Sequence, residues 1–277
     1  MSNNRTEFVQ MSNEEFVREA IGIVSKAQEN GACLRIMGAL AAYIRAVNVS
    51  HSDLFNRVRR FGDQTPLFTD LDFATYGKHS SKTARTFKEF GFKPDLMVNG
   101  LFGSKRLIYY HPQGKYHVDI FIDNLEFSHN IPFGKPGTGR LELDYPTITP
   151  SDLVLEKLQI HQINHKDLVD LIVIFITHSV TETPQKGSID GRYIGQTLAN
   201  DWGFWYDATT NLSKVEQLSE QLTANGRLNE NENTSMTRSI NDLTNIVTNT
   251  PKTRNWEKRA RAGTNKRWYN DVEEVTR

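Results

Sequence analysis

The first part of the chain alternates between apolar stripes of helical spacing and short apolar runs of strand length. Residues 14–28 carry their apolar side chains on one stripe with charged residues opposite, which predicts an amphipathic helix. Residues 33–37 predict a short buried strand, Gly38 breaks it, and residues 40–47 resume a helical pattern. This segment therefore predicts a strand, a tight turn and a helix.

The next segment predicts most of a sheet. Residues 67–75 alternate between apolar and polar positions, as in a half-buried strand. Ser80 or Ser81 can cap a helix that Gly91 ends. Three further strands and two hairpin turns are predicted at 93–98, 105–110 and 116–122, with Asn99-Gly100 and Gln113-Gly114 as the turns. The pattern indicates an α/β fold of the α+β kind, a mixed sheet flanked by helices.

The rest of the chain predicts mainly helices. Residues 149–152 combine a hydroxyl cap, a proline and an early acid, which is typical of a helix start. Two helices are expected after it, over 152–162 and 165–177. Beyond residue 181 the composition becomes polar, and we expect a loop over 187–195 and a mobile linker over 225–237.

Charge and cysteine content narrow the classes of protein. The 33 basic residues balance 33 acidic ones, so a nucleic-acid partner would have to meet a local basic patch. The single cysteine, Cys33, cannot form an internal disulfide and fits a reducing compartment. Residues 1–10 show no secretory leader, and the apolar run 171–176 is too short to span a bilayer. We therefore expect a cytoplasmic protein without a membrane partner.

Three acids at strand positions carry the candidate chemistry. Asp70 and Asp72 lie two apart in a strand, so both carboxylates project from one face. Asp119 adds a third acid in the middle of another predicted strand. Side-by-side carboxylates repel unless a cation lies between them, and oxygen ligands suit Mg²⁺ or Mn²⁺. The alternative is that Asp70 or Asp72 is solvated and that Asp119 pairs with a lysine.

These motifs resemble a known superfamily. The segments 37–40, 69–73 and 117–120 are similar to the core of the nucleotidyltransferases of DNA polymerase β-like fold. The resemblance implies that the backbone amides of Gly38 and Ala39 hold a nucleoside triphosphate (NTP) at a helix start. It also implies that Asp70, Asp72 and Asp119 hold catalytic metals, or that Asp119 acts as a general base.

Further motifs resemble the abortive-infection toxin nucleotidyltransferases and their relatives. Glu156-Lys157-Leu158 is similar to their lysine motif, residues 166–171 to their K-D-x-x-D motif, and Arg45 to the arginine of their first motif. The resemblance implies that Lys157 and Arg45 bind the nucleotide, Lys157 through the triphosphate. It also implies that Asp167 and Asp170 orient Lys157 or the acceptor. The alternative for Asp167 and Asp170 is a helix start whose acids meet the positive end of the dipole. We expect a nucleotidyltransferase-like domain over 1–180 and a helical domain over 181–277.

The C-terminal stretch 252–269 carries seven basic residues among aromatic ones, a mixture that suits RNA as an acceptor. The alternative is a helix whose tryptophans pack on the domain, with the aromatic cluster 201–206 docking this tail. His161 and His165 lie four apart without the glutamate of a zinc-protease helix, so we expect surface or core histidines.

The sequence thus predicts transfer of a nucleoside monophosphate from an NTP to an unidentified acceptor, which could be RNA, a protein or a small molecule. The rival from another class is a non-catalytic nucleotide- or RNA-binding module on the same fold. A third hypothesis is a metal-dependent phosphohydrolase that uses the same acids. Binding of NTP that persists without Mg²⁺ would favour the binding module.

Overall fold

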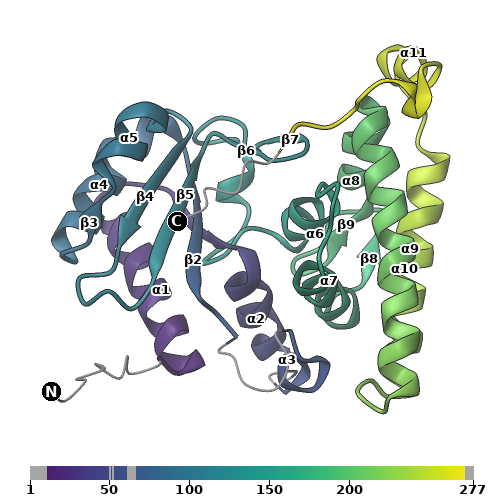
Figure 1. Cartoon of the computed structure of the whole chain (residues 1–277), viewed down its shortest axis with the longest axis horizontal. Helices are drawn as coiled ribbons and strands as arrows, with labels where there is room; N and C mark the ends of the chain where they lie inside the picture. Colours follow the sequence, from purple (N-terminus) through teal and green to yellow (C-terminus); the bar gives the residue numbers. More distant parts are fainter. Residues whose placement is uncertain (1–10, 50, 52, 61–66, 272–277) are drawn as a thin grey trace, which may run out of the picture.

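A five-stranded mixed sheet forms the centre of the first half of the protein (Figure 1). The structure is a computed structural model and describes residues 11–49, 51, 53–60 and 67–271. The sheet has the order β1-β2-β5-β4-β3, and its strands are β1 (Leu34–Met37), β2 (Asp70–Thr75), β3 (Lys93–Pro94), β4 (Arg106–Tyr110) and β5 (His117–Ile122). Strands β2 and β5 run parallel, with Asp72 directly opposite Asp119. The predicted strand at 93–98 aside, these strands confirm the expected mixed sheet.

Helices pack around this sheet, and the sequence predicts three of them. They are α1 (Asn13–Glu29), α2 (Gly38–Asn48), α3 (Leu54–Val58), α4 (Ser80–Glu89) and α5 (Leu96–Phe102). Helices α3 and α5 have no counterpart among the predicted helices. Ser12 caps α1 in a capping box with Glu15, which satisfies backbone donors at the helix start. The expected serine cap of α4 is wrong, because a 3₁₀ turn over Gly77–His79 leads directly into the helix.

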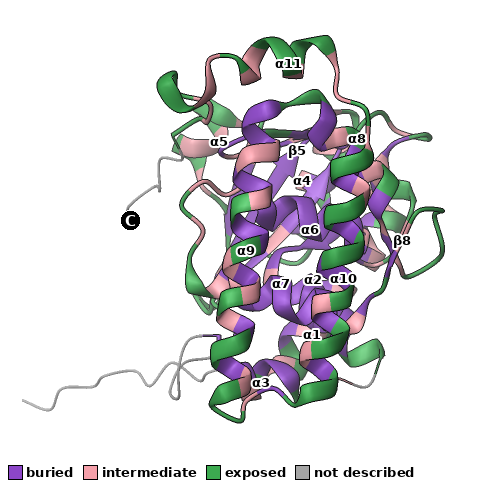
Figure 2. Cartoon of the chain, turned by 90° about the vertical axis from the view of Figure 1, so that its right-hand side faces the viewer, coloured by how far each residue is buried: buried purple, intermediate pink, exposed green. Residues whose placement is uncertain are grey.

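The second half is mainly helical and packs against the first through its first two helices. It contains α6 (Pro150–Leu158), α7 (His165–Thr177), α8 (Gly191–Asn200), α9 (Trp202–Ala224), α10 (Glu230–Asn249) and α11 (Arg254–Ala260). Two small ladders accompany them: β6 (Asn124–Glu126) with β7 (Asn130–Pro132), and β8 (Val180–Thr181) with β9 (Ile189–Asp190). Figure 2 shows α6 and α7 buried behind α9 and α10, whose outer faces are exposed.

Helices α6 and α7 connect the two halves. On one side they contact α2, and on the other they contact α9, with α10 also against α7. Buried apolar side chains from both halves form one continuous core, from Phe16 in α1 to Val247 in α10. The division at residue 180 therefore stays a prediction, since the core is shared across it.

The predicted strand over 93–98 is wrong beyond its first two residues. Asp95 caps α5 by accepting hydrogen bonds from the backbone N–H groups of Met97 and Val98. Asn99 then replaces a strand neighbour for β4, since its side chain donates to the carbonyl of Ile108 and accepts from the N–H of Ile108. The Asn99-Gly100 pair lies inside a helix rather than in a hairpin turn. By contrast, β4 and β5 form the predicted hairpin around Gln113-Gly114.

Two segments predicted as loops are helical. Gly191 and Gly195 lie in α8 against α10, where an added Cβ at Gly191 would lie 2.5 Å from Ile246 Cδ1. These glycines therefore allow two helices to approach closely. The predicted mobile linker over 225–237 is mostly α10, which Asn229 begins with a capping box to Glu232.

Helices α6 and α7 are close to their predicted lengths, and no described helix is suited to crossing a membrane. Helix α6 ends at Leu158, four residues before the predicted end, and α7 matches its predicted range. Among the described helices, none combines the length and apolar character that a bilayer crossing requires. The N-terminal segment judged to lack a leader, residues 1–10, lies outside the described residues.

Candidate active site

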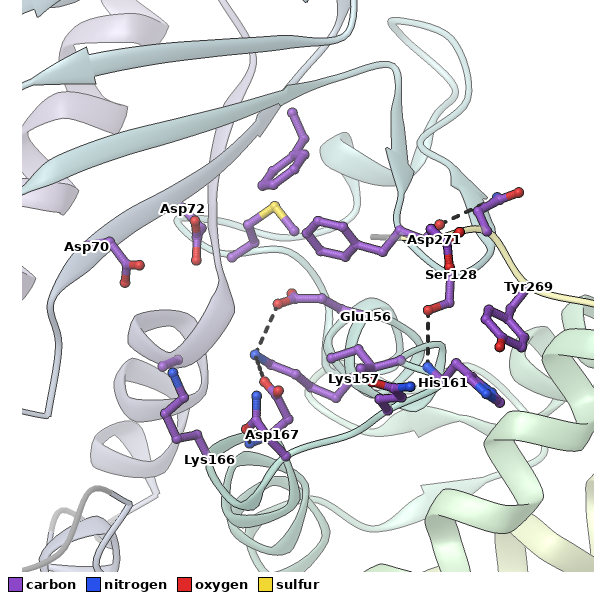
Figure 3. Close-up of a pocket in the computed structure, with 18 of the residues that line it drawn as sticks. Asp70, Asp72, Ser128, Glu156, Lys157, His161, Lys166, Asp167, Tyr269 and Asp271 are labelled. Atoms are coloured by element: carbon purple, nitrogen blue, oxygen red, sulfur yellow. Dashed lines mark hydrogen bonds and ion pairs between the residues drawn. The ribbon is translucent and has the colours of Figure 1, made fainter. Parts of the chain in front are cut away.

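A cavity of about 680 Å³ lies between the sheet and helices α6 and α7. Asp70 and Asp72 line one end, Glu156, Lys157 and Asp167 lie along its floor, and His161 and Tyr269 line the opposite end (Figure 3). The C-terminal segment reaches this cavity by leaving α11 and running back to β6 and β7, as the yellow trace in Figure 1 shows. Both halves of the chain therefore build the cavity.

Asp70 and Asp72 lie on the same face of β2, as the alternation predicts. The antiparallel register sets Met37 opposite Asp72, which brings the following Gly38 against the Asp72 carboxylate. Gly38 has φ +68°, and a Cβ added there would lie 2.6 Å from Asp72 Oδ2. Glycine is thus required both by its left-handed backbone and by the close approach of the carboxylate.

The charge on Asp72 is poorly compensated. Burial raises the pKa of Asp72 well above its ordinary value, and repulsion from Asp70, Asp119 and Glu156 adds to this, with Lys157 opposing it. A group surrounded by like charges is stabilised in its ionised form when a cation binds beside it. This end of the cavity is therefore electrostatically suited to a cation.

Asp119 lies beside Asp72 in the sheet, but its carboxylate is already paired. Arg106 Nε donates to Asp119 Oδ1 at 3.0 Å, and Arg106 Nη2 lies 2.9 Å from Asp119 Oδ2. Asp119 is buried and is not among the residues that line the cavity. The structure thus gives Asp119 an ion-pair partner, an arginine instead of the lysine of the alternative hypothesis.

Two carboxylates are enough for one type of metal site. Within the part of the chain that the structure describes, no three His, Cys, Asp or Glu side chains converge closely enough to hold a metal by themselves. Mg²⁺ is commonly held by one or two carboxylates, with substrate phosphates and water completing its shell. Asp70 and Asp72 fit this donor set, and Asp119 in its pairing with Arg106 does not join them.

The floor of the cavity is a buried ion network around Lys157. The Lys157 Nζ atom lies 2.9 Å from Asp167 Oδ1, 3.2 Å from Asp170 Oδ2 and 3.4 Å from Glu156 Oε1. Burial disfavours the charged amine, but these three carboxylates outweigh it and hold the pKa of Lys157 well above its ordinary value. Lys157 therefore stays charged, and the carboxylates around it compensate that charge.

The K-D-x-x-D acids take different places in this network. Asp170 is fully buried and does not line the cavity. It accepts a hydrogen bond from Arg60 Nε at 2.8 Å and so links Arg60 to the Lys157 network. Asp167 and Lys166 do line the cavity. The N–H of Asp167 is also bound by the cap residue Asn164, so the helix-start interpretation of Asp167 holds alongside its pairing with Lys157.

An acid of the chain itself occupies the helix start that the sequence assigns to a phosphate. The Gly38 N–H, at the first residue of α2, donates to Glu156 Oε2 at 3.1 Å. Burial raises the pKa of Glu156, while Lys157 and this hydrogen bond oppose the rise. A carboxylate at a helix N-terminus satisfies the same free amides that bind phosphate. Ala39, the neighbouring residue of the turn, lines the cavity.

Arg45 is not brought to the cavity. It is buried in α2, where its guanidinium donates to the Ile148 carbonyl at 2.6 Å and to Asp144 Oδ2 at 2.7 Å. Arg45 thus links α2 to the segment before α6. A nucleotide-binding role of this side chain has no support in the geometry.

A second polar cluster lies at the far end, around Asp207 of α9. Its carboxylate accepts from His129 at 2.8 Å, from His161 at 2.9 Å and from Trp268 Nε1 at 3.0 Å. Burial opposes the ionised form, but these hydrogen bonds hold the pKa of Asp207 below its ordinary value. His161 is therefore oriented by Asp207 and lines the cavity, while His165 is exposed at the start of α7.

The aromatic residues of the basic tail pack on the helical half. The Trp268 ring lies against Trp202 and Tyr206, and the Trp256 ring lies edge-on to Trp205. This confirms that the cluster 201–206 docks the tail. Basic side chains of the stretch nevertheless remain exposed, namely Arg254, Lys258, Arg261, Lys266 and Arg267.

Comparison with known proteins gives no assignment. The chain matches no protein-family model, no curated protein and no solved structure. Function is therefore argued from the cavity and its charges.

Sequence reasoning missed the partners of the predicted residues. Arg106 and Arg60 reach the site from distant parts of the chain and no motif identifies them, while Tyr269 belongs to the basic and aromatic stretch 252–269 but its place in the cavity was not predicted. Glu156 carried a detectable signal, since it is an acid directly before the predicted functional lysine in an otherwise apolar helix.

Proposed function

We propose that the protein transfers a nucleoside monophosphate from an NTP to an acceptor hydroxyl and releases pyrophosphate. The observation that carries this proposal is the pair Asp70 and Asp72, which share one face of β2 at the cavity, with Asp72 half-buried among further acids and Asp70 3.9 Å from His117 Nε2. Lys166 lines the same cavity and supplies positive charge for phosphate groups, whereas the charge of Lys157 serves a phosphate that displaces Asp167. The resemblance of the motifs to nucleotidyltransferases supports the same reaction.

Each residue has a defined task in this proposal. Asp70 and Asp72 would hold Mg²⁺ or Mn²⁺, which supplies charge stabilisation at the phosphate and orients it. Lys157 and Lys166 bind the triphosphate electrostatically, and Gly38 keeps α2 close to Asp72. Asp119 fixes Arg106 beside the site and positions β4 against β5.

The reaction itself is a single displacement at phosphorus. The oxygen of the acceptor hydroxyl attacks the α-phosphorus and forms a new phosphate ester. The bond from the α-phosphorus to the bridging oxygen breaks, and pyrophosphate leaves with the electron pair. The hydroxyl proton passes to solvent, since both oxygens of Asp119 are engaged by Arg106.

The acceptor class is a separate part of the proposal. RNA is the acceptor that the exposed basic residues of 254–267 favour, because they lie on the tail that leads into the cavity. A protein hydroxyl or a small molecule would not need this basic surface.

One observation favours the non-catalytic rival. The Gly38 amide and Lys157, which the resemblance assigns to the triphosphate, are bound by Glu156 and Asp167 of the same chain. Substrate would have to displace these carboxylates or bind beside them. A nucleotide-binding module without turnover is the second candidate for this reason.

Incubation with each α-labelled NTP, Mg²⁺ and total RNA or cell extract tests the proposal. We expect label on an acceptor with the wild-type protein and at least a hundredfold loss for Asp70→Asn, since one metal ligand is removed. Chelation of Mg²⁺ should abolish transfer, and added Mg²⁺ should restore it.

Asp242→Asn is the matched control, because Asp242 is an exposed aspartate of α10 that lines a different cavity. It should transfer as the wild type does. Transfer by Asp70→Asn at the rate of this control would contradict the metal role. NTP binding without transfer by any variant would favour the binding module.

A further inference from the structure

The far end of the cavity contains two stacked rings beside a guanidinium group. The Tyr269 ring lies face to face on the His161 imidazole, with ring centroids 3.6 Å apart and the planes at 14°. The guanidinium carbon of Arg267 lies 4.8 Å from the centroid of the same Tyr269 ring. Arg267 Nε also donates to the Tyr269 carbonyl at 3.0 Å, and its guanidinium forms an ion pair with Asp271.

One wall of this stack is fixed independently of Tyr269. His161 Nδ1 is hydrogen-bonded to Asp207 Oδ1 at 2.9 Å, and the His161 N–H donates to Ser128 Oγ at 3.1 Å. The imidazole therefore keeps its place if Tyr269 leaves. The face of the imidazole that Tyr269 covers would then open onto the cavity.

Trp268 and Asn270, on either side of Tyr269, hold the segment that carries it. Trp268 is held by its bond to Asp207 and by close packing on Gly203 of α9. After Trp268, the hydrogen bonds that link the described segment to the rest of the protein come from Asn270. Its N–H donates to the Ser128 carbonyl at 2.9 Å, and its amide lies 3.5 Å from the Phe127 carbonyl. Tyr269 and Asn270 can thus lift while Trp268 stays in place.

We propose that Tyr269 covers a nucleobase-binding surface on the His161 imidazole, and that residues 269–271 are a strap which a nucleotide displaces. This inference deepens the proposed function, on which it rests for the class of ligand. Stacking on aromatic rings and on guanidinium planes is the usual way in which proteins bind an unpaired base.

The rest of the cavity agrees with a nucleotide. Gln162 and Asn164 line it beside His161 and offer amide donors and acceptors to the edge of a base. Lys157 and Lys166 line the same cavity and suit a phosphate. A ligand that combines a flat polar ring with an anionic group therefore matches both ends.

Calorimetry with the full chain tests the nucleobase-binding surface without turnover. The probes are the four nucleoside monophosphates and, in a second arm, a ten-nucleotide uridine RNA, all in buffer without divalent metal. Because a strap that covers the surface lowers the competent fraction, Tyr269→Ala should bind a probe about tenfold more tightly than the wild type. If only the monophosphates bind Tyr269→Ala more tightly, the surface is assigned to a free nucleotide. If only the RNA does, the surface is assigned to the acceptor.

Two further variants separate the nucleobase-binding surface from a structural role of Tyr269. Tyr269→Phe keeps the stacked ring and should bind as the wild type does. Asn270→Pro removes the N–H that donates to Ser128 and should increase affinity while the tyrosine is retained. A Tyr269→Ala protein that binds every probe no more tightly than the wild type would overturn the inference.

The outcomes also distinguish this inference from the proposed function. Label transfer that depends on Asp70, with equal affinities for all Tyr269 and Asn270 variants, would leave the transferase standing and refute the strap. Absence of both transfer and binding in every variant would refute both.

Discussion

Substitution of Gly38 by alanine gives a sharp test of how the site is built. Gly38 combines a left-handed backbone with the closest approach to the Asp72 carboxylate. An alanine Cβ would lie 2.6 Å from Asp72 Oδ2, whereas ordinary van der Waals contacts begin at 3.4 Å. Either the carboxylate or the start of α2 must therefore move.

The loss of stability in Gly38→Ala has two separate structural causes. The positive φ of Gly38 costs an alanine about 1 to 2 kcal/mol. Relief of the contact with Asp72 adds about 1 to 2 kcal/mol, as for other overpacked positions. We expect the free energy of unfolding to fall by about 2 to 4 kcal/mol in total, and the Tm to fall by roughly 5 to 15 °C.

Gly114→Ala is the matched control for this substitution. Gly114 has φ +69°, and an added Cβ there would meet nothing within 4 Å. Its loss should be limited to the backbone cost of about 1 to 2 kcal/mol. Transfer should be unchanged in Gly114→Ala and strongly reduced in Gly38→Ala, because only the second displaces Asp72.

Urea denaturation and transfer of α-labelled NTP measure the two effects on the same preparations. Equal stability and equal transfer for the two alanine variants would refute the reasoning. It would mean that the approach of Gly38 to Asp72 has no energetic or functional consequence.

Two further predictions concern buried charge. Lys157→Met should lower the free energy of unfolding by about 3 to 5 kcal/mol in urea denaturation, since it leaves buried carboxylates without their cation. Lys105→Met, which breaks only an exposed pair with Glu126, should cost at most about 1 kcal/mol, and equal losses would contradict the network. Burial, reinforced by Arg45, lowers the pKa of His178 to about 4 from 6.5, so the folded state resists protonation. The stability it contributes is complete above pH 6.5 and is lost as the pH falls toward 4; the loss between pH 7 and pH 5 is about 2 kcal/mol. We would measure the free energy of unfolding between pH 5 and pH 7 for the wild type and for His178→Gln. If the wild type lost no more stability than the variant over this range, the role assigned to His178 would be refuted.

The elements that carry the acids could be predicted because their signals are local. Alternation along 67–75 is sufficient to set Asp70 and Asp72 on one face. The Asn229 to Glu232 capping box was equally local, but its many polar neighbours suggested a linker. Helix α10 tolerates them because one face, with Met236, Ile240 and Leu243, is buried while the other is exposed.

The glycines of α8 and the tail of the chain show where local patterns end. Gly191 and Gly195 indicate a loop until α10 is packed against them, since only that contact requires a missing Cβ. The contact of Tyr269 with His161 likewise has no local signal, because His161 lies more than a hundred residues earlier in the sequence. Such residues acquire a role only from the tertiary fold.

The acids of the site show a difference that spacing alone does not contain. Asp70, Asp72 and Asp119 have equivalent strand positions, yet Arg106 compensates only Asp119. Arg106 lies on β4, and the antiparallel register with β5 brings it diagonally across from Asp119. The two carboxylates of β2 border β1 and the cavity instead, where Asp72 meets further acids in place of an arginine. The position of each strand in the sheet therefore decides that Asp119 forms a structural ion pair while Asp70 and Asp72 border the cavity.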